Sequence, residues 1–237
     1  MNVRLLSYSQ VPPVCSDDTI DTKLTKKQLK NVQDLIAFCA RVSNPNNQYN
    51  SETAGKLIRY LVKNKHWSPL EMVSACLEIE TTRDIGRQIL RHRSFAFQEF
   101  SQRYADPTKD MKFEVRECRL QDSKNRQNSL VLDLNDPEQR ELSDLWVEKQ
   151  SKIIRDAKEI YEWAVSNGIA KEQARCVLPE GCTQSRMYMN GSLRSWVHYI
   201  DLRSKNGTQN EHIDIALGCA KEISYIFPMM YEFVNNN

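Results

Sequence analysis

The sequence predicts an α+β fold: a mostly helical single domain over residues 1–237, with a small mixed or antiparallel sheet. Several long segments repeat apolar side chains at helical spacing, whereas only a few short segments alternate with the period of two expected of a half-buried strand. The chain has 237 residues, 40% of them hydrophobic, which is enough for one sizeable core. Because it shows no internal repeat and no linker, one core is expected rather than two.

The N-terminal part is expected to contribute one strand and two helices. A strand over residues 3–8 is followed by a turn-rich, polar stretch at residues 10–25. Residues 27–43 carry apolar side chains at helical spacing, and an Asn-Pro-Asn-Asn turn ends this helix. Ser51 is placed to cap a second helix that ends near Lys65.

The middle of the chain is expected to hold a strand, a short helix and a second strand. Residues 72–81 alternate with period two near their centre, and Thr81 or Thr82 is placed to cap the helix that follows. One face of this helix carries three arginines: Arg83, Arg87 and Arg91. Residues 111–119 are the second candidate strand.

A polar stretch at residues 121–137 is expected to be a long loop, and loops of this length inside a compact domain tend to be functional or mobile. A long amphipathic helix follows from Pro137 to Ser166 and ends before Gly168. Its apolar face comprises Leu142, Leu145, Trp146, Ile153, Ala157, Ile160 and Ala164.

The C-terminal part is expected to contain one strand between helices. The short elements are a helix at residues 170–178, a strand at 184–190 and a helix at 192–204. The last helix runs from Gln209 to Val234, and Pro228 is expected to end or kink it.

The composition excludes several classes of protein. A formal net charge of +2 argues against a general nucleic-acid coat and against a membrane-surface protein. No apolar run is long enough to span a bilayer, and the N-terminus lacks the apolar stretch of a secretory signal. The seven cysteines contain no Cys-x-x-Cys pair, so we expect neither a disulfide framework nor a metal site, and the cytoplasm is the expected compartment. The seven glycines form neither Gly-x-Gly-x-x-Gly nor a Walker loop.

The positive charge is concentrated in one segment. From Arg83 to Arg103 the chain carries five arginines against two acidic residues, which indicates a site for a small anion. Ser101 and Arg103 lie two residues apart, so in an extended segment both side chains would point to the same side and reach one phosphate. Glu99 is placed to accept hydrogen bonds from a ribose hydroxyl or a base N–H. Arginines at a helix C-terminus also oppose the helix dipole, but the whole cluster favours binding.

The segment that begins Arg91-His92-Arg93 reaches Ser101 after seven further residues. This spacing resembles the signature of the flavin-dependent thymidylate synthases. Three further segments resemble other blocks of that family, in the same order along the chain: residues 66–71 (His-Trp-Ser-Pro-Leu-Glu), 174–179 (Ala-Arg-Cys-Val-Leu-Pro) and 192–203.

The resemblance implies an enzyme that methylates dUMP to dTMP. Methylenetetrahydrofolate would be the carbon donor, and FAD reduced by NADPH would be the hydride source. The resemblance also implies a homotetramer whose active site, with its FAD, lies between subunits. Neither nucleic acid nor a membrane is an expected partner. No cysteine nucleophile is expected, and Cys176 is interpreted as an ordinary unpaired thiol.

The resemblance also implies roles for individual residues. The dUMP-binding residues would be Gln88, Arg91, Glu99, Ser101, Gln102, Arg103, Arg175 and Arg203. The FAD-binding residues would be His66, Ser68, Arg91, His92, Arg93, Glu99, Ser192, Arg194 and His198. Arg203 would also be the catalytic residue, because it would lie against the uracil and stabilise the N3-deprotonated pyrimidine.

The chain departs from the family pattern at Gln102, Ser192, His198 and Gly207. Family members often have glycine at the first of these positions, asparagine at the next two and histidine at the last. The flavin contact expected at Gly207 is therefore either missing or supplied from elsewhere.

Ordinary structural roles are also open for several of these residues. Ser68 fits a helix cap, Arg175 a surface arginine, and Arg194 with His198 the solvated face of a helix. His212 has no evident role and is interpreted as a structural or surface histidine.

A second class of function stays open. The arginine cluster would also suit a non-catalytic nucleotide-phosphate-binding protein or an RNA-binding module, to which the polar loop at 121–137 and Tyr104 would contribute. The absorbance of the purified protein separates the two classes, because only the flavoenzyme would be yellow.

Overall fold

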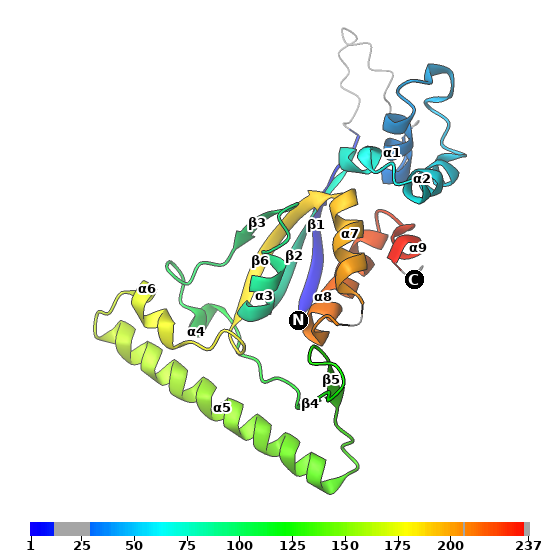
Figure 1. Ribbon diagram of the computed structural model, residues 1–237. Helices are drawn as coiled ribbons and strands as arrows, with labels where there is room; N and C mark the ends of the chain where they lie inside the picture. The colour runs from blue at the N-terminus through cyan, green and yellow to red at the C-terminus, as the bar shows by residue number, and fades with distance from the viewer. Residues whose placement is uncertain (12–28, 206, 235–237) are drawn as a thin grey trace.

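A four-stranded antiparallel sheet in the order β1-β2-β6-β3 lies at the centre of the computed structural model, which describes residues 1–11, 29–205 and 207–234 (Figure 1). The strands are β1 (Asn2–Tyr8), β2 (Ser74–Thr82), β6 (Gln184–Ser192) and β3 (Ala96–Glu99). All three pairings are antiparallel, and in the described chain helical residues outnumber strand residues. The predicted α+β class is therefore confirmed, with the antiparallel form of its sheet.

Two parts of the strand prediction are wrong. Residues 111–119 contribute only an isolated bridge, from Phe113 to Thr183, and their last residue begins a separate two-stranded hairpin. The hairpin pairs β4 (Arg119–Gln121) with β5 (Ser129–Val131), so the predicted loop at 121–137 contains a strand. Strand β3 was not expected. It holds four residues, too few for a period-two pattern to stand out from sequence alone.

The helices lie along one face of the sheet and beyond both of its ends (Figure 1). They are α1 (Val32–Ala40), α2 (Ala54–Lys63), α3 (Arg83–Ile89), α4 (Pro107–Asp110), α5 (Pro137–Ser166), α6 (Lys171–Ala174), α7 (Leu193–Arg203), α8 (Asn210–Ser224) and α9 (Met230–Val234). Three short 3-10 turns add to them: η1 (Pro45–Asn47), η2 (Ser68–Met72) and η3 (Arg175–Val177). The break between α8 and α9 contains Pro228, as predicted, whereas α4 was not expected.

The starts of the first two helices differ from the prediction. Helix α1 begins at Val32 rather than near residue 27, because the Asn31 side chain accepts a hydrogen bond from the Asp34 backbone N–H at 2.9 Å. Residues 27 and 28 of that prediction lie outside the described ranges, as does most of the stretch at 10–25. The N-cap of α2 is Thr53, so the prediction of Ser51 is wrong.

The core lies on one face of the sheet, against α3, α7 and α8. Leu77 and Ile79 from β2 and Met187 from β6 are completely buried there. Each such side chain contributes about 1.5–3 kcal/mol by leaving water. The indole N–H of Trp196 in α7 donates to the Ala75 carbonyl at 3.0 Å, which fixes α7 on the sheet. The opposite face carries ion pairs instead, among them the pair between Arg186 and Glu80 at 2.6 Å.

The loop between α3 and β3 passes very close to β6. A Cβ atom added at Gly191 of β6 would lie 2.4 Å from a ring carbon of Phe95. No side chain fits in that space, so the phenyl ring lies directly on the backbone of the strand. This contact positions the end of the Arg-His-Arg segment over the sheet.

Helix α5 projects from the end of the sheet opposite α1 and α2 (Figure 1). Its buried residues are Gln150, Ala157, Tyr161 and Ala164. The other residues of its predicted apolar face are exposed in the single chain: Leu142, Leu145, Trp146, Ile153 and Ile160. The exposed apolar face of such a helix is suited to pack against another protein chain. No helix in the described ranges has the length and apolar character of a bilayer span.

Candidate active site

The Arg-His-Arg segment lies in a turn beyond the end of α3. Helix α3 ends at Ile89, so the predicted row of three arginines along one helix face is broken: Arg91 follows the helix, and Arg83 is buried. Arg91 and Arg93 are exposed. Their guanidinium groups form no hydrogen bond or ion pair with any residue that the structure describes. Two unpaired guanidinium groups are therefore available to an anionic ligand.

His92 turns inward and contacts Arg203 at the C-terminal end of α7. The Nε of Arg203 donates a hydrogen bond to Nε2 of His92 at 2.9 Å. Because that nitrogen accepts, the proton of the neutral ring must be on Nδ1. Burial, reinforced by the charges of Arg203 and Arg91, lowers the pKa of His92 to about 4. At neutral pH the ring is therefore an uncharged acceptor that orients Arg203.

A second set of polar side chains, two of them buried, lies beside this pair. The ring of His92 stands edge-on to Tyr199, with centroids 4.8 Å apart. The hydroxyl of Tyr199 is 3.1 Å from Nε2 of His212, and Nδ1 of His212 is 3.2 Å from Oε1 of Gln88. Nε2 of Gln88 in turn donates to Oε1 of Gln209 at 2.9 Å. Two predicted site residues, Gln88 and His92, are thus linked to α7 and α8 through groups that the sequence did not indicate.

Glu99, at the end of β3, is held by three donors within its own chain. Its carboxylate accepts from Ser185 at 2.9 Å, from Arg83 at 3.4 Å and from Arg87 at 3.5 Å. Arg83 is buried, and burial lowers the pKa of its guanidinium against the raising effect of Glu99. Glu180 lies 3.3 Å from Arg87 and closes the cluster. The carboxylate is therefore fixed in position before any ligand binds.

Ser101 and Arg103 do not lie in an extended segment, so that prediction is wrong. The Tyr104 N–H bonds to the Ser101 carbonyl at 3.1 Å, which closes a turn. Oγ of Ser101 accepts from the Arg103 backbone N–H at 3.4 Å, and Nε of Arg103 is 3.4 Å from a Glu172 carboxylate oxygen. A turn also gathers hydroxyl and backbone N–H groups, so the segment still suits an anion.

Gln102 lies within this turn, and Arg175 lies on a separate element. Gln102 is buried, and its Nε2 has no hydrogen-bond partner in the described part of the chain. Arg175 begins η3, directly after the helix that carries Glu172, and is partly exposed. The salt bridge from Arg103 to Glu172 thus joins the turn to the element that carries Arg175.

The remaining predicted residues gather where η2 meets the start of α7. Ser192 caps α7 by accepting from the Ser195 N–H at 3.3 Å. Arg194 donates to Glu71 at 2.7 Å, and hydrogen bonding from Ser192 and Arg194 lowers the pKa of that carboxyl. The ring of His198 stands edge-on to Trp67 with centroids 4.5 Å apart. Burial and the charge of Arg194 lower the pKa of His198.

His66 and Ser68 lie on either side of Trp67, and both are exposed. The His66 ring is near Tyr60, with centroids 6.4 Å apart, rather than against α7. Ser68 is the first residue of η2, not its cap, so the capping interpretation is wrong.

At Gly207 the backbone has φ +92, and Oε1 of Gln127 lies 3.6 Å from where a Cβ would be. A polar side chain of the β4–β5 connection is therefore next to the position where a histidine was expected.

Four of the described cysteines have a raised thiol pKa. Burial raises the pKa of Cys39, Cys76 and Cys182, and most strongly that of the fully buried Cys219. Cys176 is exposed. Within the described ranges, no group of histidine, cysteine and acidic side chains could hold a metal ion.

Sequence reasoning gave no site role to four residues of these clusters, which are Glu71, Ser185, Tyr199 and His212, and it counted Arg83 only as part of the positively charged segment. Each of them contacts a predicted site residue that is distant in the sequence. Glu71, for example, accepts a hydrogen bond from Arg194. The only sequence signal was the apolar neighbourhood of His212, which favours a buried ring.

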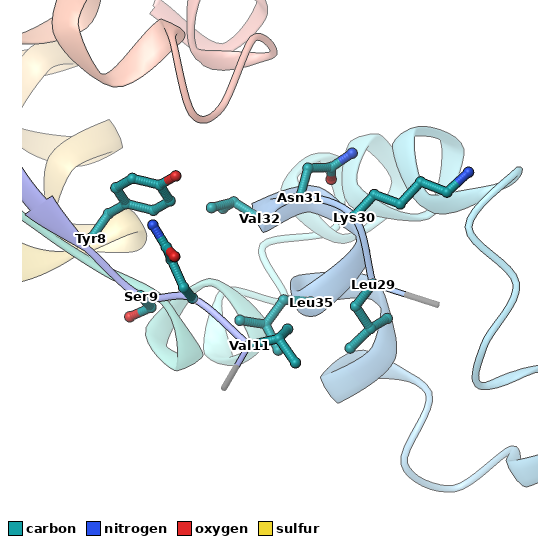
Figure 2. A pocket seen from close by; sticks show the side chains of 9 residues that line it. Tyr8, Ser9, Val11, Leu29, Lys30, Asn31, Val32 and Leu35 are labelled. Atoms are coloured by element: carbon teal, nitrogen blue, oxygen red, sulfur yellow. The ribbon is translucent and has the colours of Figure 1, made fainter. Parts of the chain in front are cut away.

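A pocket of 310 Å³ lies elsewhere, between the end of β1 and the start of α1 (Figure 2). Tyr8 and Ser9 line one side, and Val32 and Leu35 the other. None of the predicted site residues lines it, so it is separate from the candidate site.

Comparisons with known proteins place the chain in a protein family. Residues 23–229 match the family described as thymidylate synthase complementing protein. A probable flavin-dependent thymidylate synthase of Paramecium bursaria Chlorella virus 1 is 45% identical over 207 residues, which are 87% of this chain and 92% of the relative. The flavin-dependent thymidylate synthase of Synechocystis sp. is 46% identical over 194 residues, 82% of this chain and 85% of the relative.

The fold is also found among solved structures. A crystal structure of the UMP/dUMP methylase PolB from Streptomyces cacaoi, bound with 5-Br dUMP, superimposes with a TM-score of 0.73. The alignment covers 99% of this chain and 94% of that one at 23% sequence identity. At this identity the likeness concerns the fold.

Proposed function

Because the chain belongs to the family of flavin-dependent thymidylate synthases, we propose that it methylates dUMP to dTMP, with methylenetetrahydrofolate as carbon donor and NADPH as reductant. The observation that carries this proposal is the family match across residues 23–229. Overall, dUMP, methylenetetrahydrofolate, NADPH and a proton would give dTMP, tetrahydrofolate and NADP. The resulting reaction moves one carbon from the folate and two reducing equivalents from NADPH to C5 of the uracil.

The turn around Ser101 and the neighbouring η3 are the proposed phosphate site. Ser101 offers a hydroxyl, while Arg103 and Arg175 offer guanidinium groups. The weak, exposed pairing of Arg103 with Glu172 at 3.4 Å costs little to replace by a phosphate. Glu99, fixed by Arg83 and Ser185, would accept from the sugar or the base. In this proposal Gln102, whose buried Nε2 has no partner in the described part of the chain, contacts the nucleotide through its backbone.

The exposed hydrogen-bonding side chains of the candidate site suit a flavin dinucleotide. Arg91 and Arg93 present two exposed cations, as a diphosphate requires. Arg194, held by Glu71, and the exposed edge of His198 provide a second set of polar contacts beside Trp67. In the proposed complex, His66, Ser68, His92, Glu99 and Ser192 complete the set of contacts to FAD. FAD, when bound, supplies the hydride that completes the methyl group.

Arg203 is the proposed catalytic residue. Its Nε is engaged by the neutral ring of His92 at 2.9 Å, which leaves the two Nη groups to face the pyrimidine. A guanidinium stays charged at any working pH, so it stabilises an N3-deprotonated uracil. His92 adds no competing positive charge, because its pKa is about 4. No thiol takes part in this scheme.

The exposed face of α5 supports assembly into a homotetramer with the active site between subunits. Trp146 is 43% exposed, Ile153 55% and Trp163 60%, all on one helix. Several exposed large apolar side chains on one helix indicate contact with another chain. The division of the site residues into separate clusters along one chain is also what a shared site requires.

The test is the spectrum and the turnover of the purified full-length protein. We expect a yellow protein with flavin absorbance that forms dTMP only when dUMP, methylenetetrahydrofolate and NADPH are all present. Omission of each substrate in turn is the control. A colourless protein that takes up no added FAD and forms no dTMP would overturn the proposal, and RNA binding by such a protein would favour the alternative class.

A further inference from the structure

Four side chains form a hydrogen-bonded chain beneath the candidate site; Tyr199 and His212 are buried, whereas Gln88 and Gln209 are partly exposed. The order is Tyr199, His212, Gln88 and Gln209, with separations of 3.1, 3.2 and 2.9 Å. The side chain of His212 is 0% exposed, so it does not contact any ligand itself. Gln88 is partly exposed at the end of α3, four residues before His92.

The direction of these hydrogen bonds follows from the chemistry of the groups. Burial, together with the charges of Arg203 and His92, lowers the pKa of His212 to about 3, so its ring is neutral and has one donor and one acceptor. Burial raises the pKa of Tyr199, which keeps its proton. The Tyr199 hydroxyl then donates to Nε2, the His212 Nδ1–H donates to Gln88 Oε1, and Gln88 Nε2 donates to Gln209.

These bonds can reverse only as a unit. Turning the Gln88 amide by half a rotation would require the other tautomer of His212 and a turned Gln209 as well. The orientation of one amide is therefore tied to the tautomer of one buried ring.

We propose that His212 is a positioning residue whose Nδ1–H holds Oε1 of Gln88, so that Gln88 presents only an N–H donor to the pyrimidine of dUMP. The proposal rests on the proposed function, because it takes Gln88 to be a nucleotide contact. With Oε1 occupied and one N–H bound to Gln209, the second N–H of Gln88 remains for the ligand. A donor suits a carbonyl oxygen or an N3-deprotonated ring, whereas an amide oxygen in its place would repel both.

The kinetic test compares substitutions that keep or remove the donor toward Gln88. Asparagine at position 212 retains an N–H near the place of Nδ1, whereas glutamine reaches toward Tyr199 and leucine offers neither contact. We expect His212→Leu and His212→Gln to raise the KM for dUMP roughly tenfold, the effect of one lost hydrogen bond, at nearly unchanged flavin content and kcat. His212→Asn should stay within about threefold of the wild type.

A second readout does not depend on activity. The chain has four histidines, so [15N]histidine labelling gives four ring systems, and His212→Asn identifies the one in question. We expect a neutral ring with its proton on Nδ1 between pH 5 and 8. The opposite tautomer, or a ring that protonates in this range, would overturn the proposal even if the leucine variant failed to fold.

The Gln88→Ala variant distinguishes a failure of the positioning role of His212 from a failure of the proposed function. If it raises the KM for dUMP while His212→Leu and His212→Gln, both folded, do not, the proposed function stands and the positioning role is wrong. Equal losses in the asparagine and leucine variants would show that the donor is not what matters, and would also overturn it. If Gln88→Ala leaves dUMP binding unchanged in an active enzyme, Gln88 is not a nucleotide contact and the positioning role falls with that assignment.

Discussion

Acidification from pH 7 to pH 5 is expected to destabilise the folded protein by about 2 kcal/mol through His212 alone. The ring is completely buried, and its pKa falls to about 3 in the folded state, against about 6.5 in an unfolded chain. Because the folded-state pKa is the lower one, the unfolded chain binds more protons below pH 6.5. Stability is therefore complete above that pH and falls as the pH drops toward 3. At pH 5 the pH is about 1.5 units below the unfolded pKa, and each unit is worth about 1.36 kcal/mol, which gives about 2 kcal/mol.

The assay is urea unfolding at pH 7 and pH 5, followed by tryptophan fluorescence at one fixed protein concentration. His92 shifts stability in the same direction, since its pKa is lowered to about 4, so the informative quantity is a difference between variants. His212→Asn should lose about 2 kcal/mol less than the wild type over this interval. His66→Asn, at an exposed histidine, is the matched control and should behave as the wild type. An equal loss in His212→Asn and wild type would refute the argument, because the ring would then not be neutral and buried.

Four further outcomes are expected. Ser101→Ala should keep its flavin and raise the KM for dUMP roughly tenfold through one lost hydrogen bond to a charged group, and steady-state kinetics with an unchanged KM would contradict this. Arg203→Ala should slow single-turnover oxidation of the reduced flavin by about 10²–10³, with only partial recovery in Arg203→Lys; wild-type rates in both would make the residue structural. Cys176→Ser should form dTMP at the wild-type rate, and an inactive but folded variant, with dUMP recovered covalently on the wild-type thiol, would show a nucleophile. Arg83→Met should cost roughly 3 kcal/mol in urea unfolding, because it removes one partner of a buried ion pair, whereas the exposed control Arg87→Met should cost under about 1 kcal/mol; equal costs would mean that burial of Arg83 is unimportant.

Long periodic elements could be predicted from the sequence, and short ones could not. Helix α5 was expected over Pro137–Ser166 and begins and ends at those residues, because thirty residues of one period and an Asp-Pro start give a strong signal. Strand β3 and helix α4 hold four residues each, so no pattern had room to develop. The hairpin β4–β5 was missed for a similar reason, with three residues in each strand.

The candidate site could be predicted as a set of residues but not as a set of contacts. The spacing from Arg91 to Ser101 marked the segment, yet the turn at Ser101 depends on hydrogen bonds that propensity does not encode. The partners of Glu99 and Arg194 come from residues 86 and 123 positions away, respectively. Likewise, His212 gains its contacts only when α8 packs against α7 and α3. Contacts between residues so far apart in the sequence follow only from the tertiary fold.

The contact between Phe95 and Gly191 has a consequence for how the sequence can vary. A Cβ at position 191 would come within 2.4 Å of the ring, so even alanine would force the Arg-His-Arg loop away from the strand. In a library with every amino acid at this position, only glycine should survive selection for thymidine-independent growth. Shrinking Phe95 to leucine or alanine at the same time should widen the tolerated set. The two positions would then vary together, although neither would contact a ligand.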